Sequence, residues 1–439
     1  MNVLLQQPLG YRLAGVFVIG VLLGHLANVA AYALGDNRRR NPWSREHPRD
    51  GKSRWLDRLP LAGWFRLRRK ATELGTTFWL RALAVEVAMG GLCAVLYWWE
   101  IDQWALLPPG IVGTHSKIPP STITWNILHA VYASNLLLIA FMLAATLIDA
   151  DERIIPDEIT VPGTLLGLAT AAAYAWTLMP VGIAIRPPSI QFVEFITLAY
   201  PVCAYPHDWP PYLEGRDQLL PLLIALAVYG FWCISLLPWL WRPRRGFDHA
   251  TRVLIAYAMR SPNAFSVLLM ASFGGLGIGV VWWIGGPNWA ALLTSLAGLA
   301  VGGGMIWMVR IVGALIFRRE AMGFGDVTLM AMIGTFLGWQ ACVIIFFVAP
   351  CFGLVIGLSQ LVLGRGREIP YGPFLCLATV VVIAGWRWFL HKAINPYLRL
   401  FDEQPELLVM LAISMLILLA VVQLAVSLSR RKAVRAENH

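Results

Sequence analysis

The stretch WNILHAVYASNLLLIAFMLAATLI, at residues 125–148, decides the fold of this chain. It contains no Asp, Glu, Lys or Arg, and a helix needs about 20 apolar residues to cross a bilayer. We therefore predict a transmembrane helix here. Asp149 follows directly, so we expect a carboxyl group at the end of this helix, beside the hydrocarbon.

The rest of the chain repeats this pattern. Of its 439 residues, 58% are apolar and 14% are charged, whereas soluble domains carry about 25% charged residues. Further stretches of spanning length lie near 11–34, 77–99, 159–178, 217–241, 264–284, 288–316, 341–363, 371–391 and 406–428. The stretch 327–338 would rise only about 18 Å as a helix. The predicted fold class is an all-α polytopic membrane protein with about ten full transmembrane helices plus one short or re-entrant helix.

Basic residues gather in alternate loops. Residues 36–75 hold 12 Lys and Arg against five Asp and Glu, whereas 100–124 and 179–216 are poor in Lys and Arg. Because cytoplasmic loops carry the basic excess, we expect the N-terminus outside and the C-terminus in the cytoplasm. Topology thus accounts for the net charge of +10, and the expected partner is the lipid bilayer rather than nucleic acid.

We expect six regions along the chain. They are the first transmembrane helix (1–35), a basic cytoplasmic loop or small domain (36–76), transmembrane helices with the first Asp motif (77–178), an inserted external loop and two-helix unit (179–285), a core with the second Asp motif (286–391), and an extra C-terminal helix with a basic tail (392–439).

Two acidic clusters carry the chemistry. Asp149 ends one predicted helix, and Asp326 opens the short segment; the loop pattern places both on the cytoplasmic side. Two facing carboxyls share a proton, so that one activates water while the other polarises a carbonyl group. This predicts an aspartyl protease with Asp149 and Asp326 as catalytic residues. The ordinary alternatives are a helix N-cap for Asp326, and a proton relay of the kind found in transporters.

The neighbouring residues have mechanical interpretations. Gly323 and Gly325 flank Phe324, permit a tight turn and let an extended substrate backbone approach. Pro156 ends one helical register, and Asp157 or Thr160 is expected to cap the next helix. Interfacial charge or capping is the interpretation of Asp151, Glu152 and Asp157.

With these motifs the chain resembles the type IV prepilin leader peptidases, bacterial membrane aspartyl proteases of the Gly-x-Gly-Asp class. The matching segments are Ile148-Asp149, Ile155–Thr160, Arg319–Asp326, Ile369–Leu375, Gly24 with Asn28-Val29, and Arg81 with Val85-Glu86. The resemblance implies a bacterial inner (cytoplasmic) membrane location and prepilin or pseudopilin substrates, as in type IV pilus or type II secretion systems. It also implies cleavage of a basic leader on the cytoplasmic side, with Gly323, Gly325, Pro156, Asp157 and Thr328 supporting Asp149 and Asp326.

The chain departs from the family pattern in four places. Residues 36–75 contain no Cys, so we expect no thiolate zinc site there. The family links this loop with methylation, and S-adenosylmethionine is expected as a cofactor only if methylation is retained; proteolysis needs none. Thr328 replaces the usual Lys, the inserted unit separates the two aspartates, and 406–428 adds a helix. These departures leave a catalytically silent scaffold of a pilus or secretion system as an alternative.

Overall fold

The computed structural model describes most of the chain. The described residues are 7–35, 55–70, 77–106, 122–180, 182–184, 200–202, 209, 213, 218–237, 262–317, 322–362 and 370–389. The predicted helix at 406–428 lies outside them, and so do residues 36–54 and 71–76 of the predicted basic loop at 36–76.

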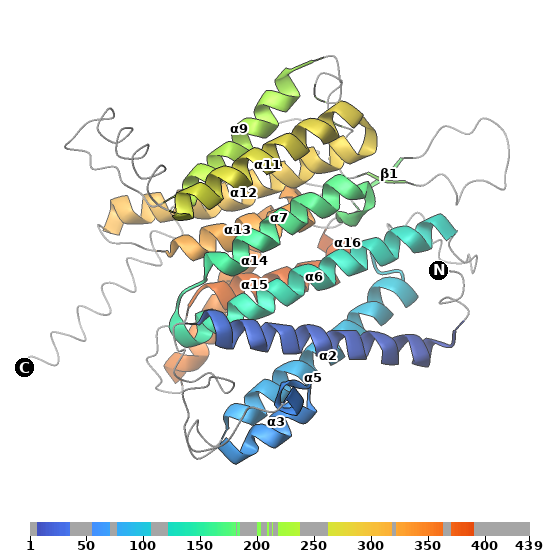
Figure 1. Cartoon of the computed structure of the whole chain (residues 1–439), viewed down its shortest axis with the longest axis vertical. Helices are drawn as coiled ribbons and strands as arrows, with labels where there is room; N and C mark the ends of the chain where they lie inside the picture. Colours follow the sequence, from blue (N-terminus) through green and yellow to red (C-terminus); the bar gives the residue numbers. More distant parts are fainter. Residues whose placement is uncertain are drawn as a thin grey trace, which may run out of the picture.

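Helices dominate the described chain (Figure 1). The long helices are α2 (Leu9–Leu34), α5 (Phe78–Tyr97), α6 (Thr122–Glu152), α7 (Asp157–Ala173), α9 (Leu220–Ser235), α11 (Pro262–Ile284), α12 (Gly286–Phe317), α13 (Phe324–Leu337), α14 (Trp339–Val362) and α15 (Gly372–Ala384). The short ones are η2 (Trp55–Arg58), α3 (Ala62–Leu67), η3 (Arg68–Lys70), η4 (Trp98–Asp102), η5 (Ala175–Thr177) and α16 (Trp386–Trp388). Strands β1 (Gly182–Ala184) and β2 (Tyr200–Val202) pair antiparallel.

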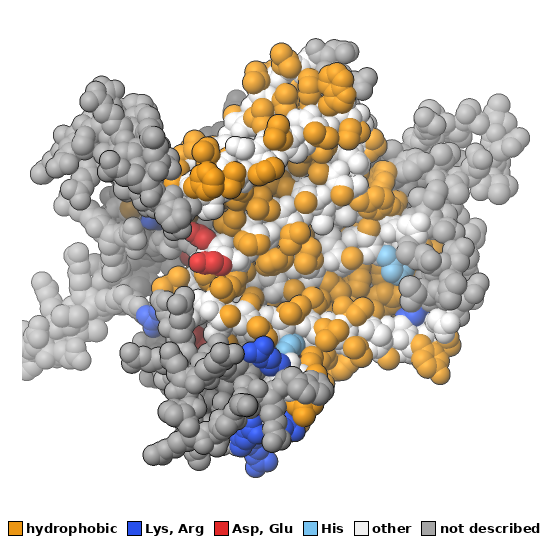
Figure 2. Space-filling view, in the orientation of Figure 1, with side chains coloured by type: hydrophobic (Ala, Val, Ile, Leu, Met, Phe, Trp, Pro, Cys, Tyr) orange, Lys and Arg blue, Asp and Glu red, His pale blue; other side chains and the backbone are white. Residues whose placement is uncertain are grey.

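The helical fold class is confirmed, and the chain is a multi-pass membrane protein. Within the described residues, six helices are long and apolar enough to cross a membrane. Helices α9, α13 and α15 are apolar but shorter, so the count of ten full spans and the direction of the termini stay predictions. Apolar side chains cover the flank of the bundle, and basic ones gather around α3 (Figure 2). This distribution suits lipid around the flank and water at the helix ends.

The short helix α13 lies in the interior, as its length predicts. Every residue from Asp326 to Leu337 is buried. Small residues permit this close packing. A Cβ added to Gly298 of α12 would contact the Gly334 carbonyl oxygen of α13. Gly167 of α7 likewise leaves room for the Thr335 side chain. The central position of α13 brings its first turn to the end of α6.

Two smaller units flank this core. Helices α9 and α11 pack together against α12 at one edge (Figure 1). At the opposite edge, residues 55–70, here termed the cap, fold into η2, α3 and η3 beside α5. The cap buries Trp64 and Leu67 almost completely, so this part of the basic segment is a small folded unit.

Candidate functional site

Asp149 lies in the last turn of α6, just before the helix ends. Its side chain is 4% exposed, and Oδ2 is buried without a hydrogen-bond partner. The helix ends because Arg153 adopts a left-handed conformation, with φ of 59°, while its N–H donates to the Asp149 carbonyl oxygen at 2.9 Å. The end of α6 thus holds a buried carboxyl group.

Asp326 lies in the first turn of α13 and is 8% exposed. The N-cap of this helix is Gly323, so the interpretation of Asp326 itself as an N-cap is wrong. Asp326 occupies the third helical position, and the Gly323 backbone N–H points back to its carboxylate. A carboxylate at this position suits the positive end of the helix dipole.

The two carboxyls belong to one site, because the first turn of α13, which carries Asp326, packs on the chain that follows Asp149. The connecting backbone shows how they meet. A Cβ added to Gly325 would lie 2.8 Å from Ile155 Cβ and 3.1 Å from the Ile155 carbonyl oxygen. Only a glycine lets the first turn of α13 rest on the chain that follows Asp149. The sequence prediction that the two acidic clusters lie together is therefore confirmed, although no catalytic role is tested by this geometry.

A third segment completes the site at the start of α15. The Gly372 backbone N–H faces the Asp149 carboxylate, and the neighbouring Tyr371 is close enough to interact electrostatically with Asp326. A Cβ added to Gly372 would lie 2.5 Å from Asp149 Oδ2 and 2.9 Å from Ile155 Cδ1. The sequence prediction assigned no site role to Gly372. The signal that could have found it was the Ile369–Leu375 motif.

The predicted supporting residues have varied surroundings. The expected capping by Asp157 or Thr160 is wrong: Pro156 is the N-cap of α7, and no side chain caps that end. The Pro156 carbonyl instead accepts the N–H groups of Ile159 and Thr160, and the extended backbone of Pro156 supplies the turn. Asp157 is exposed in the first turn, where its charge suits the helix dipole.

Thr328, the residue in place of the family's Lys, is buried and satisfied within its own helix. Its hydroxyl donates to the Gly325 carbonyl oxygen at 3.0 Å. The Thr160 hydroxyl, one turn into α7, is also buried but has no partner. Thr328 therefore supports the turn that carries Asp326, rather than presenting a polar group to a ligand.

Comparison with known proteins agrees with this arrangement. Residues 254–358, which include Asp326, match the Type IV leader peptidase family. This segment is therefore similar to type IV leader peptidases. Curated relatives named "Prepilin leader peptidase/N-methyltransferase" include one from Aeromonas salmonicida (strain A449), 26% identical over 191 residues, which are 41% of this chain and 60% of the relative. One from Stutzerimonas stutzeri is 35% identical over 100 residues, 22% and 32% of the two chains.

A third relative of that name, from Myxococcus xanthus (strain DK1622), is 41% identical over 80 residues, 18% of this chain and 24% of the relative. The chain thus spans about three fifths of the length of the Aeromonas relative and less of the others. No solved structure matches it. The matched range 254–358 includes α11, which the sequence prediction placed in the inserted unit 179–285.

Charged residues near the two carboxyls have partners in the scaffold. Arg81 of α5 binds Asp151 through Nη1, at 2.7 and 2.8 Å from its two carboxylate oxygens. Both side chains are 49% exposed, so this pair lies at the surface. The Arg310 guanidinium lies 5.6 Å from the centre of the ring of Phe324, the residue between the two glycines of the second motif. Asp151 thus has a partner of its own beside the site.

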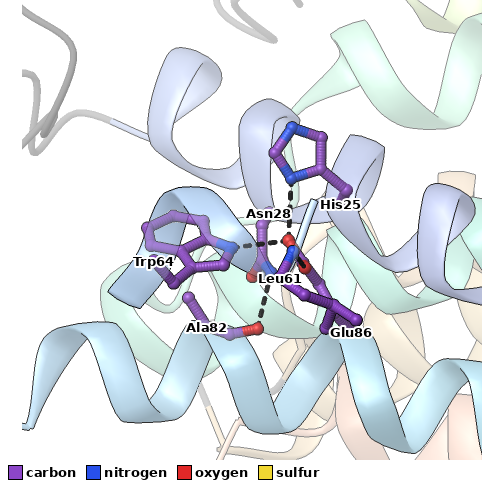
Figure 3. A network of polar contacts seen from close by, with 6 residues as sticks. All are labelled: His25, Asn28, Leu61, Trp64, Ala82 and Glu86. Carbon is purple, nitrogen blue, oxygen red and sulfur yellow. Dashed lines mark hydrogen bonds and ion pairs between the residues drawn. The ribbon is translucent and has the colours of Figure 1, made fainter. Parts of the chain in front are cut away.

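Another buried acid, Glu86 of α5, holds the cap to the bundle (Figure 3). Its side chain has no exposed surface. Oε1 accepts from Trp64 Nε1 at 2.5 Å and contacts His25 Nδ1 at 2.7 Å, while Oε2 accepts the Leu61 N–H at 2.6 Å. Asn28 of α2 donates to the Ala82 carbonyl oxygen at 2.9 Å. The network joins α2, α5 and the cap.

Proposed function

We propose that this chain is a membrane-embedded aspartic endopeptidase that cleaves the basic leader of type IV prepilins or pseudopilins on the cytoplasmic side of the bacterial inner membrane. One observation supports this above the others. Two buried carboxyls, from the end of α6 and the start of α13, interact with each other in a family of leader peptidases. A purely structural pair would gain more from basic partners than from each other.

The chemistry follows from one shared proton. Two facing carboxyls hold one proton between them, because both cannot ionise easily at short range. The ionised carboxyl takes a proton from water as the water oxygen attacks the scissile carbonyl carbon. The protonated carboxyl donates a hydrogen bond to the carbonyl oxygen. Collapse of the tetrahedral intermediate breaks the C–N bond, and a carboxyl proton passes to the leaving amine.

This hydrolysis uses water and two carboxyls, so it requires no cofactor and no metal. Methylation of the new N-terminus is a separate reaction, and S-adenosylmethionine enters only if the chain retains that activity. Gly323, Gly325 and Thr328 support Asp326 through the turn at the start of α13. Pro156 supports Asp149 through the turn that follows α6.

The test is cleavage of a purified prepilin by the protein in lipid. We expect Asp149→Asn and Asp326→Asn each to lower cleavage by at least about 10²–10⁴-fold, because Asn keeps the shape but cannot exchange the proton. Thermal unfolding serves as the folding control. A folded wild-type protein that leaves several prepilins intact would favour the catalytically silent scaffold. Near-normal cleavage by Asp326→Asn would overturn the aspartyl mechanism.

A further inference from the structure

The first turn of α5 carries a cluster of aromatic and basic side chains. The rings of Phe65 and Trp79 lie 5.8 Å apart, and the Arg68 guanidinium lies 5.6 Å from the centre of the Trp79 ring. Phe65 and Arg68 belong to the cap, whereas Trp79 belongs to the helix. Phe65, Arg68 and Trp79 are here termed the interfacial triad.

The triad lies where a membrane helix leaves the bilayer. Phe78–Asp102 is long and apolar enough to span a membrane, and Trp79 is its second residue. The next residue, Leu80, is 51% exposed, and Phe65 is 58% exposed. Exposed apolar groups in the first turn of a spanning helix face lipid, and Trp at this level marks the headgroup region. The Glu86 network fixes the cap in this position.

The charges of the cap differ in their partners. Asp57 is buried, and its two carboxylate oxygens bind Arg66 Nε at 3.1 Å and Arg69 Nη2 at 2.7 Å. Asp57 is the only acid among residues 55–70. Arg68 has no acidic partner within the described chain, and its exposed side chain lies against the Trp79 ring. A guanidinium with this environment suits a phosphate group at the bilayer surface.

We propose that the interfacial triad binds the headgroup of an anionic phospholipid, with the phosphate on Arg68 and the first part of the acyl chains against Phe65 and Leu80. The lipid is expected to be anionic because the segment is basic: residues 36–75 carry 12 Lys and Arg against five Asp and Glu. This site is independent of proteolysis. It docks the cap on the membrane at the same end of the bundle as Asp149.

A photoactivatable phosphatidylglycerol in lipid nanodiscs tests the proposal with the full chain. We expect cross-links to map to the peptides around the interfacial triad, and a phosphatidylcholine analogue to give several-fold less product there. Arg68→Gln should lower the phosphatidylglycerol yield about fivefold, as expected for one basic residue at an anionic surface. Arg68→Lys keeps the charge but loses the planar guanidinium over Trp79, so its yield should lie between those of wild type and Arg68→Gln.

Arg58→Gln is the matched control. It removes the same charge from the same cap, but Arg58 is exposed without an aromatic neighbour within the described chain. We expect its yield to stay within about twofold of wild type. Equal losses in Arg58→Gln and Arg68→Gln would mean that only diffuse charge attracts the lipid, and the site would be refuted. Equal wild-type yields with the two lipids would also refute it.

Discussion

Replacing Glu86 by Ala should release the cap from the bundle while the remaining helices stay folded. The change removes the acceptor of two N–H donors, from Leu61 and Trp64, and the partner of His25 (Figure 3). All of these groups lie in a network whose central side chain has no exposed surface. Breaking a buried charged network in this way costs about 3–5 kcal/mol.

This loss of free energy shifts the equilibrium between the docked cap and a locally open cap toward the open form. The Leu61 backbone adopts a φ of 55° without glycine, and the bond from its N–H to Glu86 helps to hold that conformation. At about 1.4 kcal/mol per factor of ten, a loss of 3–5 kcal/mol raises the open population by a factor between about 10² and about 4 × 10³. Trypsin cleavage at Arg66 and Arg68 should accelerate by a similar factor where opening is fast compared with cleavage.

The matched variants sharpen this test. Glu86→Gln keeps one carbonyl oxygen for Trp64 and His25 but turns an NH₂ group toward the Leu61 N–H. One buried donor is then unpaired, which costs about 1–3 kcal/mol, so cleavage should accelerate about tenfold to 100-fold. Asp102→Asn, at the other end of the same span, should have no effect on the cap. Unchanged proteolysis of the cap in Glu86→Ala would refute the anchoring role of the network.

Two further substitutions concern the site. Gly372→Ala should lower kcat for prepilin cleavage by about 10–100-fold with a nearly unchanged KM, because the added Cβ would displace the Asp149 carboxylate. Gly357→Ala is the control, because a Cβ added there meets no atom within 4 Å. Equal rates for the two variants would contradict the role given to Gly372. Asp151→Asn should cost at most about 1 kcal/mol of stability, measured by thermal unfolding, and keep cleavage within about threefold, because its bridge to Arg81 is exposed. A loss as large as that of Asp149→Asn would move the catalytic role to Asp151.

The sequence predicted the helices well because hydrophobic length is a local property. Each predicted stretch that the structure describes contains a helix, and 327–338 was recognised as interior because it is too short to span. The meeting of Asp149 with Asp326 was also predictable, since topology places both at the same end of the bundle. Such arguments need only the order of segments and the charge of the loops.

The parts that escaped prediction depend on three-dimensional contacts. Gly372 matters because a backbone from a third segment approaches Asp149, and nothing local to its sequence indicates that distance. Glu86 was named only as part of a matching motif, because its partners come from α2 and the cap. The capping of α7 was mispredicted because polar side chains suit a helix start, whereas here the rigid Pro156 already forms the turn.

The last prediction concerns the predicted inserted unit 179–285. Its two helices meet where Tyr229 of α9 donates to the Met270 carbonyl oxygen at 2.9 Å and contacts Gly274 of α11. The family match begins at residue 254, so it includes α11 but not α9. If α9 is an addition at the edge of the bundle, loosening it should affect stability but not chemistry.

Tyr229→Ala removes a buried aromatic side chain and its hydrogen bond to the Met270 carbonyl oxygen, at a cost of about 3–5 kcal/mol. We expect a lower unfolding temperature in detergent and a kcat for prepilin cleavage within about twofold of wild type. Phe231→Ala is the control, because that ring is 61% exposed on the same helix and its loss should change neither quantity much. The contrary outcome is a Tyr229→Ala variant that stays inserted and folded but loses cleavage as fully as Asp326→Asn. In that case α9 acts on the catalytic pair through α12, and the predicted boundary of the peptidase core must move to include α9.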